Sequence, residues 1–225
     1  CPNIKLERHA TMLAFITTDA SIAKTMLDKV FAEALESSFN MITVDGDMST
    51  NDTVFILANG QAGNQKIVEE DNDFATFSRG LAYVMKDLAT KIVMDAEGAT
   101  KFVEVMAKVS GSRHDAKKIV RAVTNSILLK TAVYGEDPNW GRVIAACGSS
   151  GVAFDQNKVD VFIGDVKVFT DGARSKGINM RKLQSVFKQN RIGITIDLKS
   201  GLAEAVGWTC DLSKKYVEIN AGYST

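Results

Sequence analysis

The chain has 225 residues, and its 27 basic and 27 acidic side chains leave a formal net charge of zero. An apolar content of 45% with no net charge argues against an intrinsically disordered chain. No lysine–arginine block occurs, which argues against a nucleic-acid-binding protein. No apolar run approaches the roughly 18 residues of a membrane span, and residues 1–10 lack the apolar core of a secretory signal.

Cofactor and redox motifs are largely absent from the sequence. Three widely spaced cysteines, Cys1, Cys147 and Cys210, argue against a disulfide framework and fit a reducing compartment. No standard zinc signature, Walker loop, dinucleotide fingerprint or hydrolase elbow occurs. The acidic loop that begins at Asp45 fails as a calcium loop, because Thr50 and Ile56 stand where glycine and glutamate are needed.

Hydrophobic periodicity predicts strands and helices interspersed along the chain. In chain order they are a strand at 11–18, a helix at about 22–35, strands at 39–44 and 53–57, a helix at 73–95, a strand at 102–109, a helix from 115 to 127, a hairpin of 159–163 with 166–169, and strands at 191–198 and 216–219. Because the helices carry one-sided apolar stripes, the pattern indicates an α/β or α+β fold with helices packed on a sheet. No repeat or break in composition divides the chain.

Several local residues refine this prediction. Asp19 or Ser21 is expected to cap the first helix and Asp115 the third, and Gly98 is expected to end the second. Residues 135–142 (GEDPNWGR) predict a loop, because they contain two glycines and a proline. The polar residues 45–52 either line a site or form a solvated connection between two strands.

Five segments, in order, resemble the ornithine acetyltransferase family, also called the bifunctional glutamate N-acetyltransferase family. They are ATMLAFI at 10–16, SFN at 38–40 running into ITVDGDMSTNDT at 42–53, EGATK at 97–101, GEDPNWGRVIAACGSSG at 135–151, and CDLSKKYVEINAGYST at 210–225. The resemblance implies a layered sheet-and-helix sandwich of the ornithine acetyltransferase and DmpA-like type. It also implies a precursor that cuts itself between Ala10 and Thr11. Residues 1–10 would then be the remnant of an α chain, and residues 11–225 a compact catalytic β chain.

The resemblance makes Thr11 the nucleophile. Its hydroxyl would first cut the precursor and then carry an acetyl group from N2-acetylornithine to glutamate by a ping-pong reaction in arginine biosynthesis. The α-amine freed by cleavage titrates near 7.7–8.0 in models, so it is a suitable general base for the hydroxyl beside it. No metal or other cofactor is implied, although some relatives use acetyl-CoA as a co-substrate. The oxyanion donors that acyl transfer needs are expected on the α chain.

Three further residues match substrate-contact positions of the family: Glu97, Asn220 and Thr225. A carboxylate suits a cationic amino group, and an asparagine both donates and accepts hydrogen bonds. The sequence departs from the family pattern at Ser224, where many relatives have arginine, and at residues 4–9, which separate Pro2-Asn3 from Ala10-Thr11.

The expected partners are an α chain from the same precursor, in an α2β2 heterotetramer, and small amino-acid substrates, with neither nucleic acid nor membrane involved. The expected compartment is the cytoplasm, or an organelle in a eukaryote. Two alternatives stay open. One is an N-terminal-threonine aminopeptidase or amidase on the same scaffold, in which water replaces glutamate as the acceptor. The other is a binding or structural subunit without activity.

Overall fold

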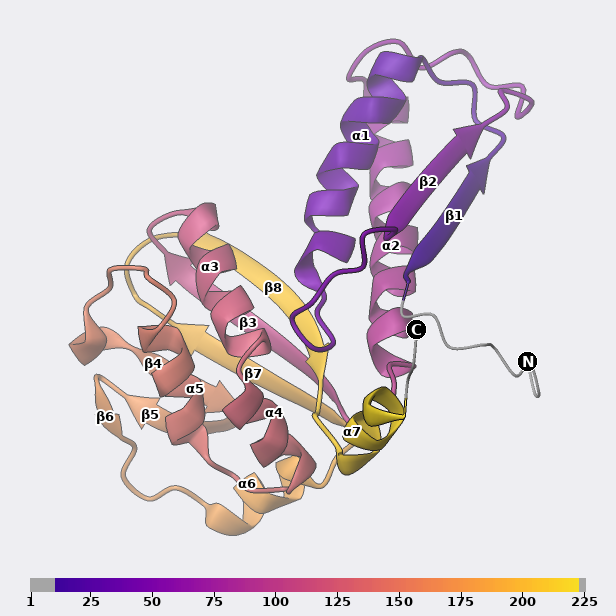
Figure 1. Ribbon diagram of the computed structural model, residues 1–225. Coiled ribbons are helices and arrows are strands. Elements are labelled where there is room, and N and C mark those ends of the chain that lie inside the picture. The colour runs from indigo at the N-terminus through magenta and orange to yellow at the C-terminus, as the bar shows by residue number, and fades with distance from the viewer. Residues whose placement is uncertain (1–10, 223–225) are drawn as a thin grey trace. The chain divides into compact units, whose positions relative to one another are not determined.

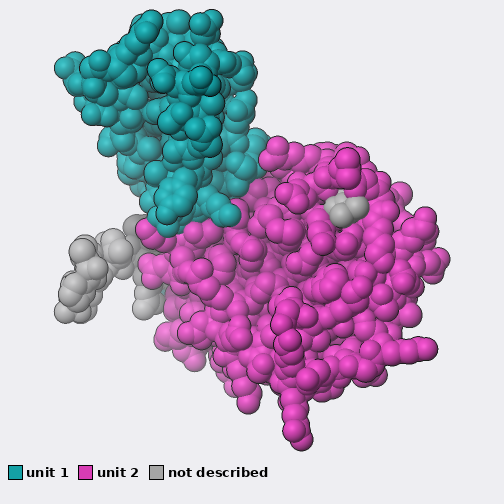
Figure 2. All heavy atoms as spheres, turned by 180° about the vertical axis from the view of Figure 1, so that it is seen from behind, with its two compact units in different colours: residues 1–40, 47–88, 222–225 teal, residues 41–46, 89–221 magenta. Residues whose placement is uncertain are grey.

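The computed structural model describes residues 11–222, with the backbone alone at 109 and 110. The predicted α-chain remnant, residues 1–10, therefore lies outside the described residues. The described chain forms two compact units (Figure 2): unit 1 holds residues 11–40, 47–88 and 222, and unit 2 holds residues 41–46 and 89–221. One crossing between the units falls inside helix α2 (Asn72–Met94), which is why no change in composition marks it.

Unit 1 is built on two parallel strands, β1 (Leu13–Thr18) and β2 (Thr53–Ala58), with α1 (Lys24–Glu36) and the first part of α2 beside them (Figure 1). Side chains alternate across the strands. Ala14 and Ile16 are buried, whereas Leu13 and Phe15 are exposed. The sheet thus has one packed face and one apolar face that no described residue covers.

Unit 2 contains a six-stranded sheet in the order β6-β5-β4-β7-β3-β8. Its strands are β3 (Phe102–Ser110), β4 (Asp160–Ile163), β5 (Val166–Thr170), β6 (Ala173–Arg174), β7 (Arg191–Asp197) and β8 (Ala203–Cys210). β3 and β7 are parallel, and the other neighbouring strands are antiparallel. Trp208 and Glu104 are partners across β8 and β3, and the indole nitrogen donates to the carboxylate at 2.8 Å.

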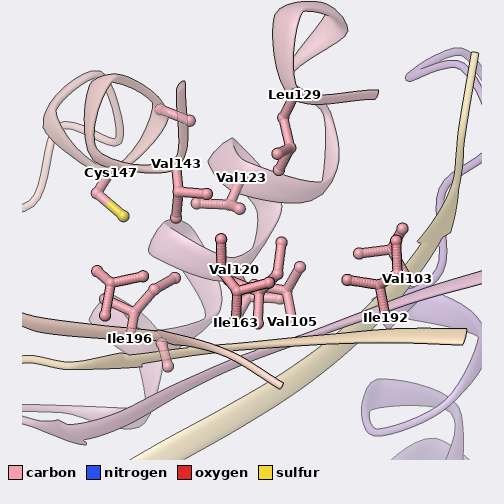
Figure 3. Packing of buried hydrophobic residues seen from close by; sticks show 14 of the residues in the cluster. Val103, Val105, Val120, Val123, Leu129, Val143, Cys147, Ile163, Ile192 and Ile196 are labelled. Atoms are coloured by element: carbon pink, nitrogen blue, oxygen red, sulfur yellow. The ribbon is translucent and has the colours of Figure 1, made fainter. Parts of the chain in front are cut away.

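Three helices cover one face of this sheet: α3 (Arg113–Thr124), α4 (Ile127–Tyr134) and α5 (Trp140–Gly148) (Figure 1). Figure 3 shows valines and isoleucines of β3, β4 and β7 pointing toward these helices, and Val120 and Val123 of α3 are fully buried among them. Two more helices complete the unit, α6 (Met180–Phe187) and α7 (Lys214–Ala221). No helix in the described range 11–222 is long and apolar enough to cross a bilayer.

The predicted α/β class is confirmed, with helices layered on a sheet. The predicted strand at 39–44 is wrong, because residues 39–41 form a 3-10 helix and Ile42 makes only an isolated bridge to Trp208. The predicted strand at 216–219 is also wrong, because those residues belong to α7. Asp19 and Ser21 do not cap α1, which begins after Ala23 without a side-chain cap.

The predicted cap of α3 is displaced. Ser112 is the N-cap and accepts from the Asp115 amide at 3.0 Å, while the Ser112 hydroxyl donates to the Asp115 carboxylate. Ile127 does not extend the buried face of α3, since it begins the separate helix α4 and is 63% exposed. The periodicity missed the helices α4, α5 and α6 and the strands β6 and β8.

The GEDPNWGR segment is a loop only up to Asn139, because α5 begins at Trp140. The Trp140 ring packs against Phe169 with centroids 5.6 Å apart. The Arg142 guanidinium donates to the Leu128 carbonyl at 2.5 Å. These contacts give the segment a structural role, joining α5 to the sheet and to α4.

A matched pair of glycine substitutions tests the packing of α3 on β8. A Cβ at Gly207 would lie 2.5 Å from Val120 Cγ1 and 2.9 Å from the Met41 carbonyl oxygen, whereas a Cβ at Gly193 meets nothing within 4 Å. Gly207→Ala should therefore lower the free energy of unfolding by about 1–3 kcal/mol through overpacking. Gly193→Ala should change it by less than about 1 kcal/mol. Urea unfolding of both variants measures the difference, and equal effects would contradict this packing.

Candidate functional site

The predicted nucleophile, Thr11, lies in unit 1, separated from β1 by Met12, and is partly buried. Its Oγ1 atom is 3.0 Å from Ser49 Oγ, and either hydroxyl can be the donor. The hydroxyl of Thr11 is therefore directed at a second hydroxyl from a segment 38 residues along the chain.

The residues around Ser49 form a turn that is hydrogen-bonded to the backbone beside Thr11. The Asp52 carboxylate accepts from the Met12 amide at 2.9 Å and from the Ser49 amide at 3.3 Å. The Asn51 amide donates to Ser49 Oγ at 3.2 Å. One end of the polar loop 45–52 thus lies at the predicted nucleophile. The signal in the sequence was a Ser-Thr-Asn-Asp run, whose side chains form local turns, immediately before the strand that pairs with β1.

Glu97 lies in unit 2, in the turn that follows α2. The helix α2 ends at Met94, so Glu97 lies outside the last turn of that helix. Gly98 has a left-handed φ of +69°. It also lies so close to α7 that a Cβ would be 2.6 Å from the Tyr216 amide nitrogen. Glycine is needed here for this approach and its conformation rather than to stop the helix.

Asn220 lies on α7, also in unit 2, and its Nδ2 donates to Glu97 Oε2 at 3.0 Å. The same nitrogen donates to the Tyr216 carbonyl at 3.0 Å. One turn earlier on the helix, the Tyr216 hydroxyl donates to the Asp45 carboxylate at 2.9 Å. The structure therefore brings together two of the predicted substrate contacts, Glu97 and Asn220, and adds Asp45 as a second carboxylate next to the same helix.

Two buried side chains hold the Glu97 turn against the segment that leads into α7. The Asp211 carboxylate accepts from the backbone amides of Thr100 and Lys101 at 2.8 and 2.9 Å, and from the Thr100 hydroxyl at 2.6 Å. The Ser213 hydroxyl donates to the Gly98 carbonyl at 2.6 Å and accepts from the Tyr216 amide at 3.2 Å. Ser213 thereby caps α7, which is why Val217 and Ile219 continue a helix and not the predicted strand.

A buried lysine fixes the end of β8, from which this segment starts. Lys130 Nζ on α4 donates to Thr209 Oγ1 and to the Cys210 carbonyl, each at 2.7 Å. Burial lowers the pKa of the Lys130 ammonium, despite the attraction of Cys210 and Asp211. Burial raises the pKa of the Cys210 thiol and raises that of Cys147 to about 12, so neither cysteine is a ready thiolate nucleophile at neutral pH.

The remaining predicted site residues and a pocket of unit 2 lie elsewhere. Ala10 and Thr225 are outside the described residues. Thr11 belongs to unit 1 and the Glu97–Asn220 pair to unit 2. A pocket of about 220 Å³ in unit 2 is lined by Cys147, Phe154 and Phe169 among others, and by none of the predicted site residues.

Comparison with known proteins gives a consistent result. The model of the ArgJ family matches residues 1–225. The chain is 46% identical over 220 residues to the arginine biosynthesis bifunctional protein ArgJ of Caldanaerobacter subterraneus subsp. tengcongensis, covering 96% of this chain and 54% of that protein. It is 46% identical over 224 residues to the glutamate N-acetyltransferase of Methanocaldococcus jannaschii, covering 96% and 55%. The chain spans about half the length of these curated relatives.

A solved structure also matches. The crystal structure of the arginine biosynthesis bifunctional protein ArgJ from Bacillus halodurans superimposes with a TM-score of 0.91 at 38% sequence identity. The match covers 94% of this chain and 100% of that chain.

The contacts of Asp211 predict the effect of removing its carboxylate. Asp211→Ala should lower the free energy of unfolding by about 2–3 kcal/mol, because two backbone amides and one hydroxyl lose their acceptor in a buried setting. The matched control is Asp165→Ala, whose exposed carboxylate pairs with the exposed Lys182; it should cost less than about 1 kcal/mol. Urea unfolding measures the free energy of unfolding of both variants. An equal loss of stability in the two would contradict the role given to the Asp211 carboxylate.

Proposed function

The chain belongs to the ArgJ family, and from that premise we propose that it is the catalytic part of a glutamate N-acetyltransferase of arginine biosynthesis. In this proposal an acetyl group moves from N2-acetylornithine to glutamate through an acetyl-Thr11 intermediate. The names of the relatives, an arginine biosynthesis bifunctional protein and a glutamate N-acetyltransferase, support this reaction. The single observation that carries the assignment to Thr11 is the directed contact of its hydroxyl with Ser49 at 3.0 Å.

We propose that a longer precursor supplies this chain and its partner, an α chain. The Thr11 oxygen attacks the carbonyl carbon of Ala10, the Ala10–Thr11 C–N bond breaks, and the acyl group moves to oxygen as an ester. Water then hydrolyses the ester, which releases the α chain and leaves Thr11 with a free amine. Support comes from the lengths of the relatives: curated proteins extend to about twice this chain, whereas the chain of the solved relative is matched over its whole length.

The exposed face of the β1–β2 sheet supports the proposal that a partner chain binds there. Leu13, Phe15, Phe55 and Leu57 are 48–66% exposed, and the two phenylalanine rings stack with centroids 5.6 Å apart. Exposed apolar side chains gathered on one face are typical of an interaction surface. The proposal assigns this face to the α chain and takes the assembled enzyme as an α2β2 heterotetramer in the cytoplasm.

The transfer reaction follows from the two functional groups of Thr11. The free amine accepts the hydroxyl proton as the oxygen bonds to the acetyl carbon of N2-acetylornithine. The C–N bond to ornithine breaks, and the proton passes to the leaving amine. The amine of glutamate then attacks the acetyl ester, the C–O bond to Thr11 breaks, and the oxygen regains its proton. No metal or other cofactor enters this scheme, and acetyl-CoA is an additional acetyl donor in the proposal.

Glu97 and Asn220 are proposed to bind the amino-acid substrate, together with Thr225. The Asn220 amide nitrogen donates to Glu97 Oε2 and to the Tyr216 carbonyl. The Glu97 carboxylate and the Asn220 amide oxygen are therefore the acceptors that these two residues offer to a ligand. Acceptors of this kind suit the ammonium group of ornithine or glutamate. The Asp211 and Ser213 contacts support this role, because they hold the Glu97 turn in place before a ligand arrives.

Substitution of the nucleophile tests the proposed reaction. In the complete protein, Thr11→Ala should leave an uncut precursor without acetyl transfer, because no hydroxyl remains. Thr11→Ser should keep both activities at a reduced rate. Thr76→Ala, which removes an exposed hydroxyl on α2 bonded to the Asn72 carbonyl, is the matched control and should behave like wild type.

Electrophoresis detects the cut, and product analysis separates the alternatives. N-acetylglutamate formed in step with ornithine is the expected result. Free acetate in its place would identify an amidase, and an active uncut precursor would contradict the mechanism.

Removal of the Glu97 charge tests substrate binding. Glu97→Gln should raise the KM for N2-acetylornithine by roughly 10- to 100-fold, the equivalent of losing a hydrogen bond to a charged group. Glu218→Gln on α7 removes an exposed carboxylate that pairs with Lys215, and it should leave KM unchanged. Initial-rate kinetics measure both variants. An unchanged KM for Glu97→Gln would remove this residue from the binding site.

A further inference from the structure

The neighbour of the Thr11 hydroxyl is a fixed group. Ser49 Oγ lies 3.0 Å from Thr11 Oγ1 and accepts a hydrogen bond from the Asn51 amide at 3.2 Å. A serine hydroxyl has one proton to donate and two lone pairs to accept. The amide of Asn51 occupies one lone pair, so the Ser49 proton and the second lone pair can serve Thr11.

The backbone around Ser49 is held in place by the same segment that carries Thr11. Asp52 accepts from the Met12 and Ser49 amides, and the Thr53 amide donates to the Met12 carbonyl at 2.9 Å. From there the parallel ladder of β1 and β2 starts with Leu13 opposite Thr53. These bonds hold the backbone at Met12 against the turn at 49–52, and the Asn51 amide holds Ser49 Oγ in place beside Thr11.

We propose that Ser49 is a catalytic residue of the acetyl transfer, acting directly on the Thr11 oxygen. This inference rests on the proposed function. In the free enzyme, Ser49 accepts a hydrogen bond from the Thr11 hydroxyl and fixes its direction. In the acetyl-enzyme, the Thr11 oxygen has no proton, so the contact persists only with Ser49 as the donor.

The donor form of Ser49 matters most when the acetyl group leaves Thr11. As the amine of glutamate bonds to the acetyl carbon, the C–O bond to Thr11 breaks and negative charge grows on Thr11 Oγ1. The Ser49 hydroxyl points a proton at that charge, in a geometry already set by the Asn51 and Asp52 contacts. Thr11 Oγ1 then takes the proton released by the attacking amine, and Ser49 ends the cycle with its own proton. A preorganised donor of this kind contributes to the rate and not to ground-state binding.

Asp52 has a different part in this arrangement. Its carboxylate accepts hydrogen bonds from two backbone amides, those of Met12 and Ser49. It is therefore a positioning residue that holds the turn against the start of β1.

The test uses the complete protein with Ser49→Ala, Ser49→Thr and the control Ser185→Ala. Ser185 is an exposed serine of α6 whose hydroxyl donates to the Lys182 carbonyl within its own helix. Ser49→Ala should lower kcat by roughly 100-fold, the usual scale for losing one donor at a developing oxyanion. Because release of the acetyl group is the slowed step, KM for N2-acetylornithine should fall together with kcat, and kcat/KM for this substrate should stay near the wild-type value. Ser49→Thr, which keeps the hydroxyl, should recover most of the rate, and Ser185→Ala should match wild type.

Acid quenching during turnover, followed by peptide mass spectrometry, provides the readout that a structural role would not move. The fraction of acetylated Thr11 should rise in Ser49→Ala, because release of the acetyl group is the step that is slowed. If Ser49→Ala is poorly folded, the turnover rate and the acetylated fraction of Ser49→Thr test the proposal in its place. A folded Ser49→Thr variant that has lost activity would overturn the proposal. Wild-type rates and acetylation in Ser49→Ala would overturn it as well, with the function of Thr11 intact. A wild-type enzyme that never carries acetyl on Thr11 would instead overturn the proposed function, and this inference with it.

Discussion

The parallel pairing of β1 with β2 is the constraint on which the geometry at Thr11 depends. Because Leu13 lies opposite Thr53, the residues just before each strand, Thr11 on one side and Ser49 to Asp52 on the other, meet at the same end of the sheet. Parallel neighbours need a long connection, and α1 with the polar loop provides it. The hydroxyl oxygens of Thr11 and Ser49 thus lie 3.0 Å apart, although neither residue belongs to a strand.

A second constraint orders the proposed substrate contacts in unit 2. Gly98 permits a close backbone approach to α7 that any side chain would block, and Asp211 and Ser213 secure that approach with buried hydrogen bonds. The Glu97 carboxylate and the Asn220 amide then lie 3.0 Å apart, although 123 residues separate them in sequence. The hydrogen bonds that hold this pair in place come from Asp211 and Ser213, which do not contact a ligand in the proposed reaction.

The sequence predicts well those elements whose apolar pattern is long and regular, such as α2 and β3, and the α/β class that follows from them. It fails where a strand-like apolar pattern follows a residue that caps a helix. Val217 and Ile219 favour a strand, but the Ser213 cap starts a helix there. The site is harder still: the resemblance supplies Thr11, Glu97 and Asn220, whereas Asp211 and the role of Ser49 depend on hydrogen bonds across 38 to 111 residues. No spacing of residues in the sequence predicts those contacts.

The account as a whole depends on Thr11 carrying an acetyl group between two substrates. The most direct measurement is to mix the purified complete protein with N2-acetylornithine in the absence of glutamate, quench with acid, and sequence the modified peptides by mass spectrometry. The account predicts a chain that begins at Thr11 and carries one acetyl group on the oxygen of that residue, which disappears when glutamate is added. An acetyl group on another side chain, or an unmodified Thr11 in an enzyme that still forms N-acetylglutamate, would contradict it.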